Sequence, residues 1–243
     1  MASRYDRIGV DYAELRKPDP RIAAAINQAL GSARTVLNVG AGAGSYEPAG
    51  REVTALEPSI EMIRQRPPAA APVVRGRAEE LPFADSSFDA STAILTVHHW
   101  RDQAKGLSEM RRVTQGPVVI LTYDPAFRGF WLADYLPELI ALDEAQMPRI
   151  ADYERWLGPI DSCSVPIPCD CADGFLCAYW RRPAAYLDPR IRAAISSFWA
   201  LGDVSEALAR LEADLVSGAW TERYGQLLEL EEFDCGYRLV VTH

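Results

Sequence analysis

Three glycines and one glutamate near the start of the chain have the types and spacing of a ligand-binding loop. Gly40, Gly42 and Gly44 follow the mainly apolar run Thr35–Val39, and Glu57 lies at the end of the next apolar run. Glycines after a strand let the backbone approach a bound ligand closely, because they carry no Cβ atom. A carboxylate at the end of the second strand can accept both hydroxyls of a ribose. Together these residues predict a site for a nucleoside cofactor.

The spacing of the glycines indicates which cofactor this is. A dinucleotide fingerprint, G-x-G-x-x-G, would need a glycine at position 45, where this chain has Ser45. The pattern G-x-G-x-G, followed by an acid at the next strand end, instead resembles motif I of the class I S-adenosylmethionine (SAM) methyltransferases. The resemblance implies SAM as cofactor and S-adenosylhomocysteine as product.

Further segments carry the same resemblance. Tyr12-x-x-x-Arg16 is similar to the family's N-terminal lid segment, and Met62 matches the apolar residue that covers the adenine. Residues 76–83 resemble the family's G-D-A-E-x-L-P-F segment, and residues 95–100 resemble its L-H-H-W segment. The cofactor-binding residues that the resemblance implies are Tyr12, Arg16, Asn38, Val39, Gly40, Ala41, Gly42, Tyr46, Glu57, Pro58, Met62, Ala78, Glu79, Leu95 and Thr96.

One position departs from the family pattern. Where the family has the aspartate that bonds the adenine amino group, this chain has Arg77. A guanidinium has no acceptor, so it cannot take that proton. Either Glu79 or the backbone at Ala78 serves instead, or adenine recognition is looser.

Methyl transfer needs a positioned nucleophile and, where that nucleophile carries a proton, a group that accepts it. His98 and His99 follow the fourth predicted strand, at the edge where open α/β sheets bind ligands. We expect one of them to face the transferred methyl group. Asp124 ends the fifth strand at the same edge and is a candidate for binding substrate or assisting as a base. The alternatives are that both histidines are structural and that Asp124 is a turn acid.

These residues need an α/β scaffold to bring them together. The patterns predict strands over residues 35–39, 52–57, 73–74, 88–95, 118–121 and 237–241, a short edge strand over 165–168, and helices over 21–30, after Ser59 and over 102–113. Strands that alternate with helices indicate a mostly parallel sheet. The resemblance implies a Rossmann-like, doubly wound sheet of seven strands in the order 3-2-1-4-5-7-6, with the last strand antiparallel.

The second half of the chain has a different texture. We expect a single domain over residues 1–243, with helical insertions at about 125–160 and 174–234 that form a lid over the active edge. Five cysteines, at positions 163, 169, 171, 177 and 235, show no C-x-x-C knuckle and no nearby histidine. They are expected to be free thiols and not metal ligands.

Composition limits the partners. The chain has 243 residues and a formal net charge of −9, which disfavours nucleic acid as a ligand. It has no apolar run of roughly 18 residues, so no membrane span is expected. We therefore predict a cytoplasmic methyltransferase, monomeric or homodimeric, that methylates a small molecule at O, N or C. The alternatives are an NAD(P)-dependent oxidoreductase and a non-catalytic SAM-binding regulatory protein.

Overall fold

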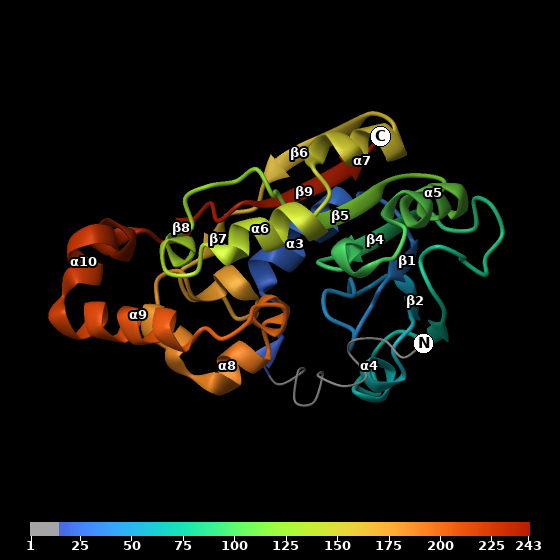
Figure 1. The fold of residues 1–243 in the computed structure, drawn as a ribbon. Helices are drawn as coiled ribbons and strands as arrows, with labels where there is room; N and C mark the ends of the chain where they lie inside the picture. Colours follow the sequence, from blue (N-terminus) through green and yellow to red (C-terminus); the bar gives the residue numbers. More distant parts are fainter. Residues whose placement is uncertain (1–14) are drawn as a thin grey trace.

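The structure, a computed structural model that describes residues 15–243, is built on a seven-stranded sheet (Figure 1). Its strands are β1 (Thr35–Val39), β2 (Glu52–Glu57), β3 (Val73–Arg75), β4 (Ala90–Ile94), β5 (Val118–Tyr123), β6 (Ile160–Ser164) and β9 (Tyr237–Thr242). They lie in the order β3-β2-β1-β4-β5-β9-β6, and β9 is antiparallel to both of its neighbours. Counted along the chain, this is the predicted order, so the predicted fold class is confirmed.

The helices of the first half begin at side-chain caps. Asp19 accepts a hydrogen bond from the Arg21 N–H at 3.0 Å at the start of α3 (Pro20–Ala29). Ser59 caps α4 (Ile60–Arg64), as the sequence predicts, and Asp102 caps α5 (Gln103–Val113). Each cap satisfies an N–H group that has no partner within its helix. The caps therefore fix where each of these helices begins.

The two faces of the sheet bury separate apolar clusters. Neighbouring residues of a strand point to opposite faces. In β1, Val36 joins Ile22 and Ile26 of α3, whereas Leu37 joins Met110 of α5. A sheet that is covered on both faces explains why β1 and β5 are almost continuously apolar.

One predicted strand is misplaced. We expected residues 165–168 to form the short edge strand, but the edge strand of the sheet is β6, which pairs with β9. Ile167–Pro168 instead forms β7, which pairs with β8 (Glu232–Phe233) in a separate two-stranded sheet. The sequence of β6 is Ile-Asp-Ser-Cys-Ser, and four of its five residues are exposed. It therefore lacks the apolar alternation that would have marked it as a strand.

Short helical segments make up most of the chain between β5 and β9. They are η2 (Trp131–Asp134), α6 (Glu138–Gln146), α7 (Ile150–Leu157), η3 (Leu176–Tyr179), η4 (Pro183–Leu187), α8 (Pro189–Ala193), η5 (Ser196–Trp199), α9 (Ser205–Ser217), α10 (Ala219–Tyr224) and η6 (Gly225–Glu229). Of these, α8, α9 and α10 lie together on one side of the molecule, away from β1 and β2 (Figure 1). Within residues 15–243, every helix is too short or too polar to cross a bilayer.

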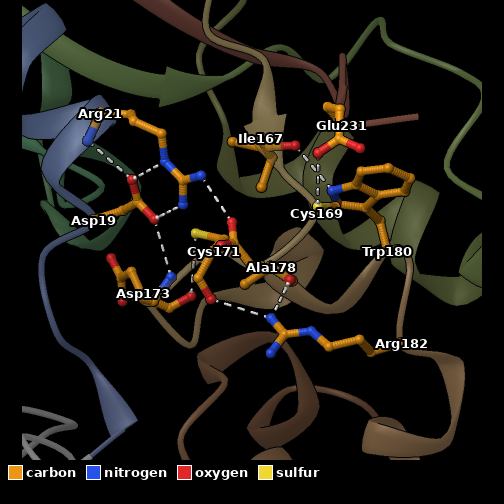
Figure 2. A network of polar contacts seen from close by, with 12 residues as sticks. Asp19, Arg21, Ile167, Cys169, Cys171, Asp173, Ala178, Trp180, Arg182 and Glu231 are labelled. Atoms are coloured by element: carbon orange, nitrogen blue, oxygen red, sulfur yellow. Dashed lines mark hydrogen bonds and ion pairs between the residues drawn. The ribbon is translucent and has the colours of Figure 1, made fainter. Parts of the chain in front are cut away.

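A polar network joins the start of α3 to the loop after β7 (Figure 2). Asp19 Oδ2 accepts a hydrogen bond from the Ala172 N–H at 3.0 Å, and Arg21 Nη1 lies 2.7 Å from Asp170 Oδ1. On the other side of this loop, Arg182 donates to the carbonyl of Cys171 at 3.1 Å. The loop therefore has polar contacts with the start of α3 on one side and with the segment after η3 on the other.

Candidate active site

The turn after β1 is shaped by positive backbone φ angles, 71° at Gly40 and 52° at Gly42. A Cβ atom at Gly40 would lie 2.2 Å from Thr96 Oγ1, so only glycine fits beside the end of β4. The N–H groups of Gly40 and Ala41 donate to the carbonyl of Leu56 at 2.8 and 3.0 Å. The backbone therefore holds the turn against the carboxyl end of β2.

Glu57, the last residue of β2, fastens the same turn from the other side. Its Oε2 accepts a hydrogen bond from the Gly42 N–H at 2.9 Å, and its Oε1 accepts one from the Ser59 N–H at 2.8 Å. The residue is 6% exposed. The carboxylate of Glu57 therefore joins the turn after β1 to the start of α4.

A cavity of about 370 Å³ opens beside this turn, and we call it the first cavity. Its volume is within the range of cofactor and small-molecule sites. The predicted cofactor-binding residues that line it are Arg16, Asn38, Gly40, Ala41, Gly42, Tyr46, Glu57, Pro58, Met62, Ala78, Glu79, Leu95 and Thr96. Also in its wall are Ala43, Ser45, Leu56, Arg77, Ile94, Trp100, Arg101 and Gln146, together with both predicted histidines.

Among residues 15–243, Val39 is the predicted cofactor residue that does not line this cavity. Val39 is fully buried and packs in the apolar cluster on the α5 face. Tyr12 lies outside the described residues.

The wall that the resemblance assigns to adenine contains Met62, Arg77 and Glu79. Met62 is 3% exposed, which suits an apolar contact with a base. Glu79 Oε1 accepts hydrogen bonds from the N–H groups of Arg101 at 2.7 Å and Asp102 at 3.2 Å. Its carboxylate therefore holds the loop before α5 as well as lining the cavity.

A buried ion pair lies beside the first cavity, which Arg16 and Tyr46 line. Arg16 Nε lies 2.6 Å from Asp173 Oδ1, and the Tyr46 hydroxyl donates to Asp173 Oδ2 at 2.9 Å. Asp173 is 1% exposed. Burial, with the nearby charge of Asp173, raises the pKa of Tyr46 far above its usual value, so this tyrosine stays a neutral donor. The N-terminal segment and the loop after β7 therefore meet at the cavity.

The two histidines lie on a short helical turn, η1 (Val97–His99), directly after β4, and their ring centroids are 3.8 Å apart. Both line the first cavity. Burial, together with the positive charge of Arg16, lowers the pKa of His98 to about 4. At neutral pH its imidazole is uncharged and is a weak base.

A second cavity of about 50 Å³ adjoins the first. Arg16, Leu95 and His98 line both cavities and so form their common wall. Leu95 has a φ of 51°, a costly conformation for a leucine and one that often marks functional sites. The remaining residues of the second cavity come from β5 and the chain that follows it: Tyr123, Asp143, Met147, Phe175, Leu176, Ile195, Ser196, Ser197 and Tyr237.

Asp143, on α6, is a candidate site residue that sequence reasoning missed. It is 9% exposed, and burial raises its pKa to about 7, against an opposing effect of Arg128. A carboxyl with a pKa near neutrality suits proton transfer. The one signal in the sequence was its spacing of four residues from Leu139, which puts both on the buried side of α6.

Asp124 lies apart from these cavities. It follows β5, and its Oδ1 accepts a hydrogen bond from the Ala126 N–H at 2.9 Å. It is not among the described residues that line the first or the second cavity. Its position fits the turn acid that we considered as the alternative.

The cysteines are dispersed. Cys163 is exposed on β6, whereas Cys171, Cys177 and Cys235 are buried. Within residues 15–243, no three histidine, cysteine, aspartate or glutamate side chains gather in a way that could hold a metal ion.

Comparison with known proteins agrees with this geometry. The family model of the methyltransferase domain matches residues 37–120. A solved structure from Anabaena variabilis, described as a methyltransferase from an antibiotic biosynthesis pathway, is 35% identical and superposes with a TM-score of 0.87. That match covers 94% of this chain and 99% of the other.

Two curated relatives match over shorter stretches. Demethylmenaquinone methyltransferase of Renibacterium salmoninarum is 39% identical over 106 residues, which are 39% of this chain and 44% of the relative. Malonyl-[acyl-carrier protein] O-methyltransferase of Pseudescherichia vulneris is 32% identical over 123 residues, 47% of this chain and 49% of the relative. The chain thus spans about half the length of these relatives, or less.

The protein belongs to the class I SAM-dependent methyltransferases. The near-complete match to the Anabaena structure shows this, and the family model covers the strands that build the first cavity. The predicted family and its cofactor, SAM, are confirmed. The alternative of an NAD(P)-dependent oxidoreductase is not confirmed.

Proposed function

We propose that this protein transfers the methyl group of SAM to a small molecule held in the second cavity. The common wall formed by Arg16, Leu95 and His98 is the observation that carries this proposal. A SAM methyl group that faces this wall from the first cavity would point toward an acceptor in the second cavity. The lining of the second cavity by residues after β5 supports a small acceptor enclosed by the protein.

The residues present fit the cofactor. A Cβ atom at Gly40 would clash with Thr96, Glu57 brings a carboxylate that accepts hydrogen bonds to the cavity wall, and the cavity has a suitable volume. SAM supplies an electrophilic methyl group on a sulfonium. The protein positions the acceptor in line with it and excludes water.

We propose that His98 borders the point of transfer and that His99 contacts the cofactor side. The neutral imidazole of His98 can accept a hydrogen bond from an acceptor's O–H or N–H without adding charge. Its low pKa makes it a positioning group more than a proton acceptor.

We also propose that residues 125–160 and 174–234 act as a lid in a single domain. The C-terminal end of α6 supports this, because Gln146 lines the first cavity while Asp143 lines the second. The net charge of −9 supports a small acceptor and not a nucleic acid. A cytoplasmic location and a monomeric or homodimeric state stay predictions from the sequence.

Calorimetry tests the cofactor part of the proposal. The purified protein should bind S-adenosylhomocysteine and SAM, and should show no heat with NAD. Absence of binding to both nucleosides would overturn the proposed function.

Turnover distinguishes an enzyme from a SAM-binding regulator. With methyl-labelled SAM and a library of small metabolites, label should appear in at least one acceptor. Tight binding of the cofactor with no labelled product across the library would favour the regulator.

A further inference from the structure

A third cavity, of about 190 Å³, lies beyond the second. Tyr123, Asp143 and Leu176 line both the second and the third cavity and form the partition between them. The three cavities therefore follow one another, from the cofactor site to a space lined mainly by residues that follow β5 in the chain. This arrangement offers room for an acceptor whose body extends beyond the point of methyl transfer.

The size and lining of the third cavity restrict what fits. An apolar cavity of about 150 Å³ accommodates benzene, so this one is large enough for one ring with small substituents. Five of its lining residues are aromatic, namely Tyr123, Phe127, Phe130, Trp131 and Tyr224. The second cavity, of about 50 Å³, is large enough only for a small functional group.

The charged groups of the third cavity differ in whether they already have partners. Arg128 pairs with Glu144 and donates to two backbone carbonyls. Asp134 lies 2.9 Å from Arg223 Nη2 and accepts a hydrogen bond from the Tyr224 hydroxyl at 2.5 Å.

Asp143 is different. Although it is 9% exposed, its carboxyl makes no hydrogen bond or ion pair with another residue in the range 15–243. A buried carboxyl without a partner is costly, and such groups are typically satisfied by a ligand or serve a function. Its place in the partition puts it beside any acceptor that reaches from the third cavity into the second.

We propose that the acceptor is a single-ring molecule whose ring occupies the third cavity and whose hydroxyl or amino group enters the second, where Asp143 accepts its proton. This inference rests on the proposed function. The acceptor's lone pair forms a bond to the methyl carbon, and the bond from that carbon to the sulfonium sulfur breaks. Its electron pair neutralises the sulfur, while the proton of the acceptor moves to the carboxylate of Asp143.

The electrostatic surroundings suit this role. Burial raises the pKa of Asp143 to about 7, and the positive charge of Arg128 opposes this rise. The ionisable groups that interact with Asp143 from other elements are Tyr123 of β5, Cys177 of η3 and Tyr237 of β9, and burial raises the pKa of each, so they stay neutral. Arg16 and His98 lie across the second cavity, and His98 is uncharged at pH 7. Above pH 7 the carboxylate therefore meets the acceptor without a competing anion among these groups.

A size-matched panel tests the acceptor class. Single-ring phenols and anilines, and fused two-ring analogues of each, are incubated with the protein and methyl-labelled SAM. We expect labelled products from the single-ring panel only. If S-adenosylhomocysteine binds but the single-ring compounds stay unlabelled, or if only the two-ring compounds are labelled, this inference is overturned while the proposed cofactor site stands.

Variants test the role of Asp143. D143N should lower kcat/KM at pH 8 by about 100-fold or more, which is typical for a lost general base, and leave the Kd of S-adenosylhomocysteine within about twofold. E138Q removes an equal charge from the exposed start of the same helix and should change neither. The wild-type kcat/KM should rise with pH through a midpoint near 7, and D143N should lose this limb. A flat wild-type profile from pH 5.5 to 8.5, or full activity of D143N, contradicts the proposal.

Thermal unfolding gives a readout that needs no acceptor. Because the pKa of Asp143 lies above its usual value of 3.8, the folded protein holds this proton more tightly than the unfolded chain. The resulting stabilisation is present below pH 4 and is lost as the pH rises to about 7. D143N should therefore have a higher Tm than the wild type at pH 8 and an equal Tm at pH 4, with E138Q like the wild type at both. A lower Tm of D143N at pH 8 would show that the carboxylate is paired and structural.

Discussion

The cofactor half, from β1 to β5, and the chain between β5 and β9 form their cavities in different ways. In the cofactor half, backbone geometry sets the site: positive φ angles at Gly40 and Gly42, and N–H groups held by Glu57. Beyond β5, side chains such as Asp143 and Leu176, carried on short helices, form the walls. A backbone-built site can serve one cofactor in many proteins, whereas a side-chain wall changes its ligand with single substitutions.

The two regions also differ in what holds them in place. Strand pairing fixes the cofactor half. The loop after β7 instead makes polar contacts with Asp19 and Arg21 (Figure 2) and an ion pair with Arg16. Perturbing one region at a time should therefore produce distinct effects.

The largest expected effect is on the anchor of the loop after β7. D173N removes the negative charge from a buried ion pair with Arg16, which should cost about 3 kcal/mol of the free energy of unfolding. D170N weakens the exposed pair with Arg21 and should cost less than about 0.5 kcal/mol. Urea denaturation measures both, and equal losses would mean that the buried pair is no stronger an anchor than the exposed one.

Next in size is a test of the backbone-built turn. In G40A the new Cβ would lie 2.2 Å from Thr96 Oγ1, so overpacking should cost about 2 kcal/mol beyond the strain of a positive φ. G50A is the matched control, since Gly50 has a φ of 77° and open space around it. We expect calorimetry to show weakened binding of S-adenosylhomocysteine in G40A alone. Similar binding and stability in the two variants would show that the close approach to Thr96 is unimportant.

A smaller effect is expected at the ribose acid. E57Q replaces one acceptor oxygen by an amide NH₂ group. This group would face the N–H of either Gly42 or Ser59 and could not accept its hydrogen bond. The Kd of S-adenosylhomocysteine should rise by about 10-fold to 100-fold, the range for losing a hydrogen bond to a charged group. E52Q, at the exposed start of the same strand, should leave the Kd unchanged. An unaltered Kd in E57Q would remove this residue from the cofactor site.

A further effect concerns pH and the wall between the first two cavities. The pKa of His98 is lowered from 6.5 to about 4, so the unfolded chain binds this proton more tightly between those values. On account of His98, stability rises with pH from 4 to 6.5, whereas Asp143 makes it fall over a similar window. H98Q should therefore show a steeper loss of stability with rising pH than the wild type, by urea denaturation at several pH values. The opposite slope would mean that His98 is not desolvated.

The sequence predicted the cofactor half well because its features are local. Glycines at a strand end, an N-cap serine and continuous apolar strands each follow from the conformation of a few neighbouring residues. The bounds predicted for β1 and β2 match the structure, and the sheet order is confirmed.

The remaining features depend on tertiary structure. The polar sequence of β6 forms a strand only because β9 offers it an edge. Asp143 belongs to no motif, and it becomes part of a site because α6 places it beside Tyr123 of β5. Asp124 shows the converse, since an acid at the expected sheet edge turns its carboxylate to its own loop.

A crystal structure of the protein with S-adenosylhomocysteine tests the central claim most directly. We predict the amino-acid end of the ligand beside the Gly40–Gly42 turn, its ribose on Glu57, and its sulfur at the wall of Arg16, Leu95 and His98, facing the second cavity. A ligand bound elsewhere, or one whose sulfur is turned away from this wall, would contradict the account.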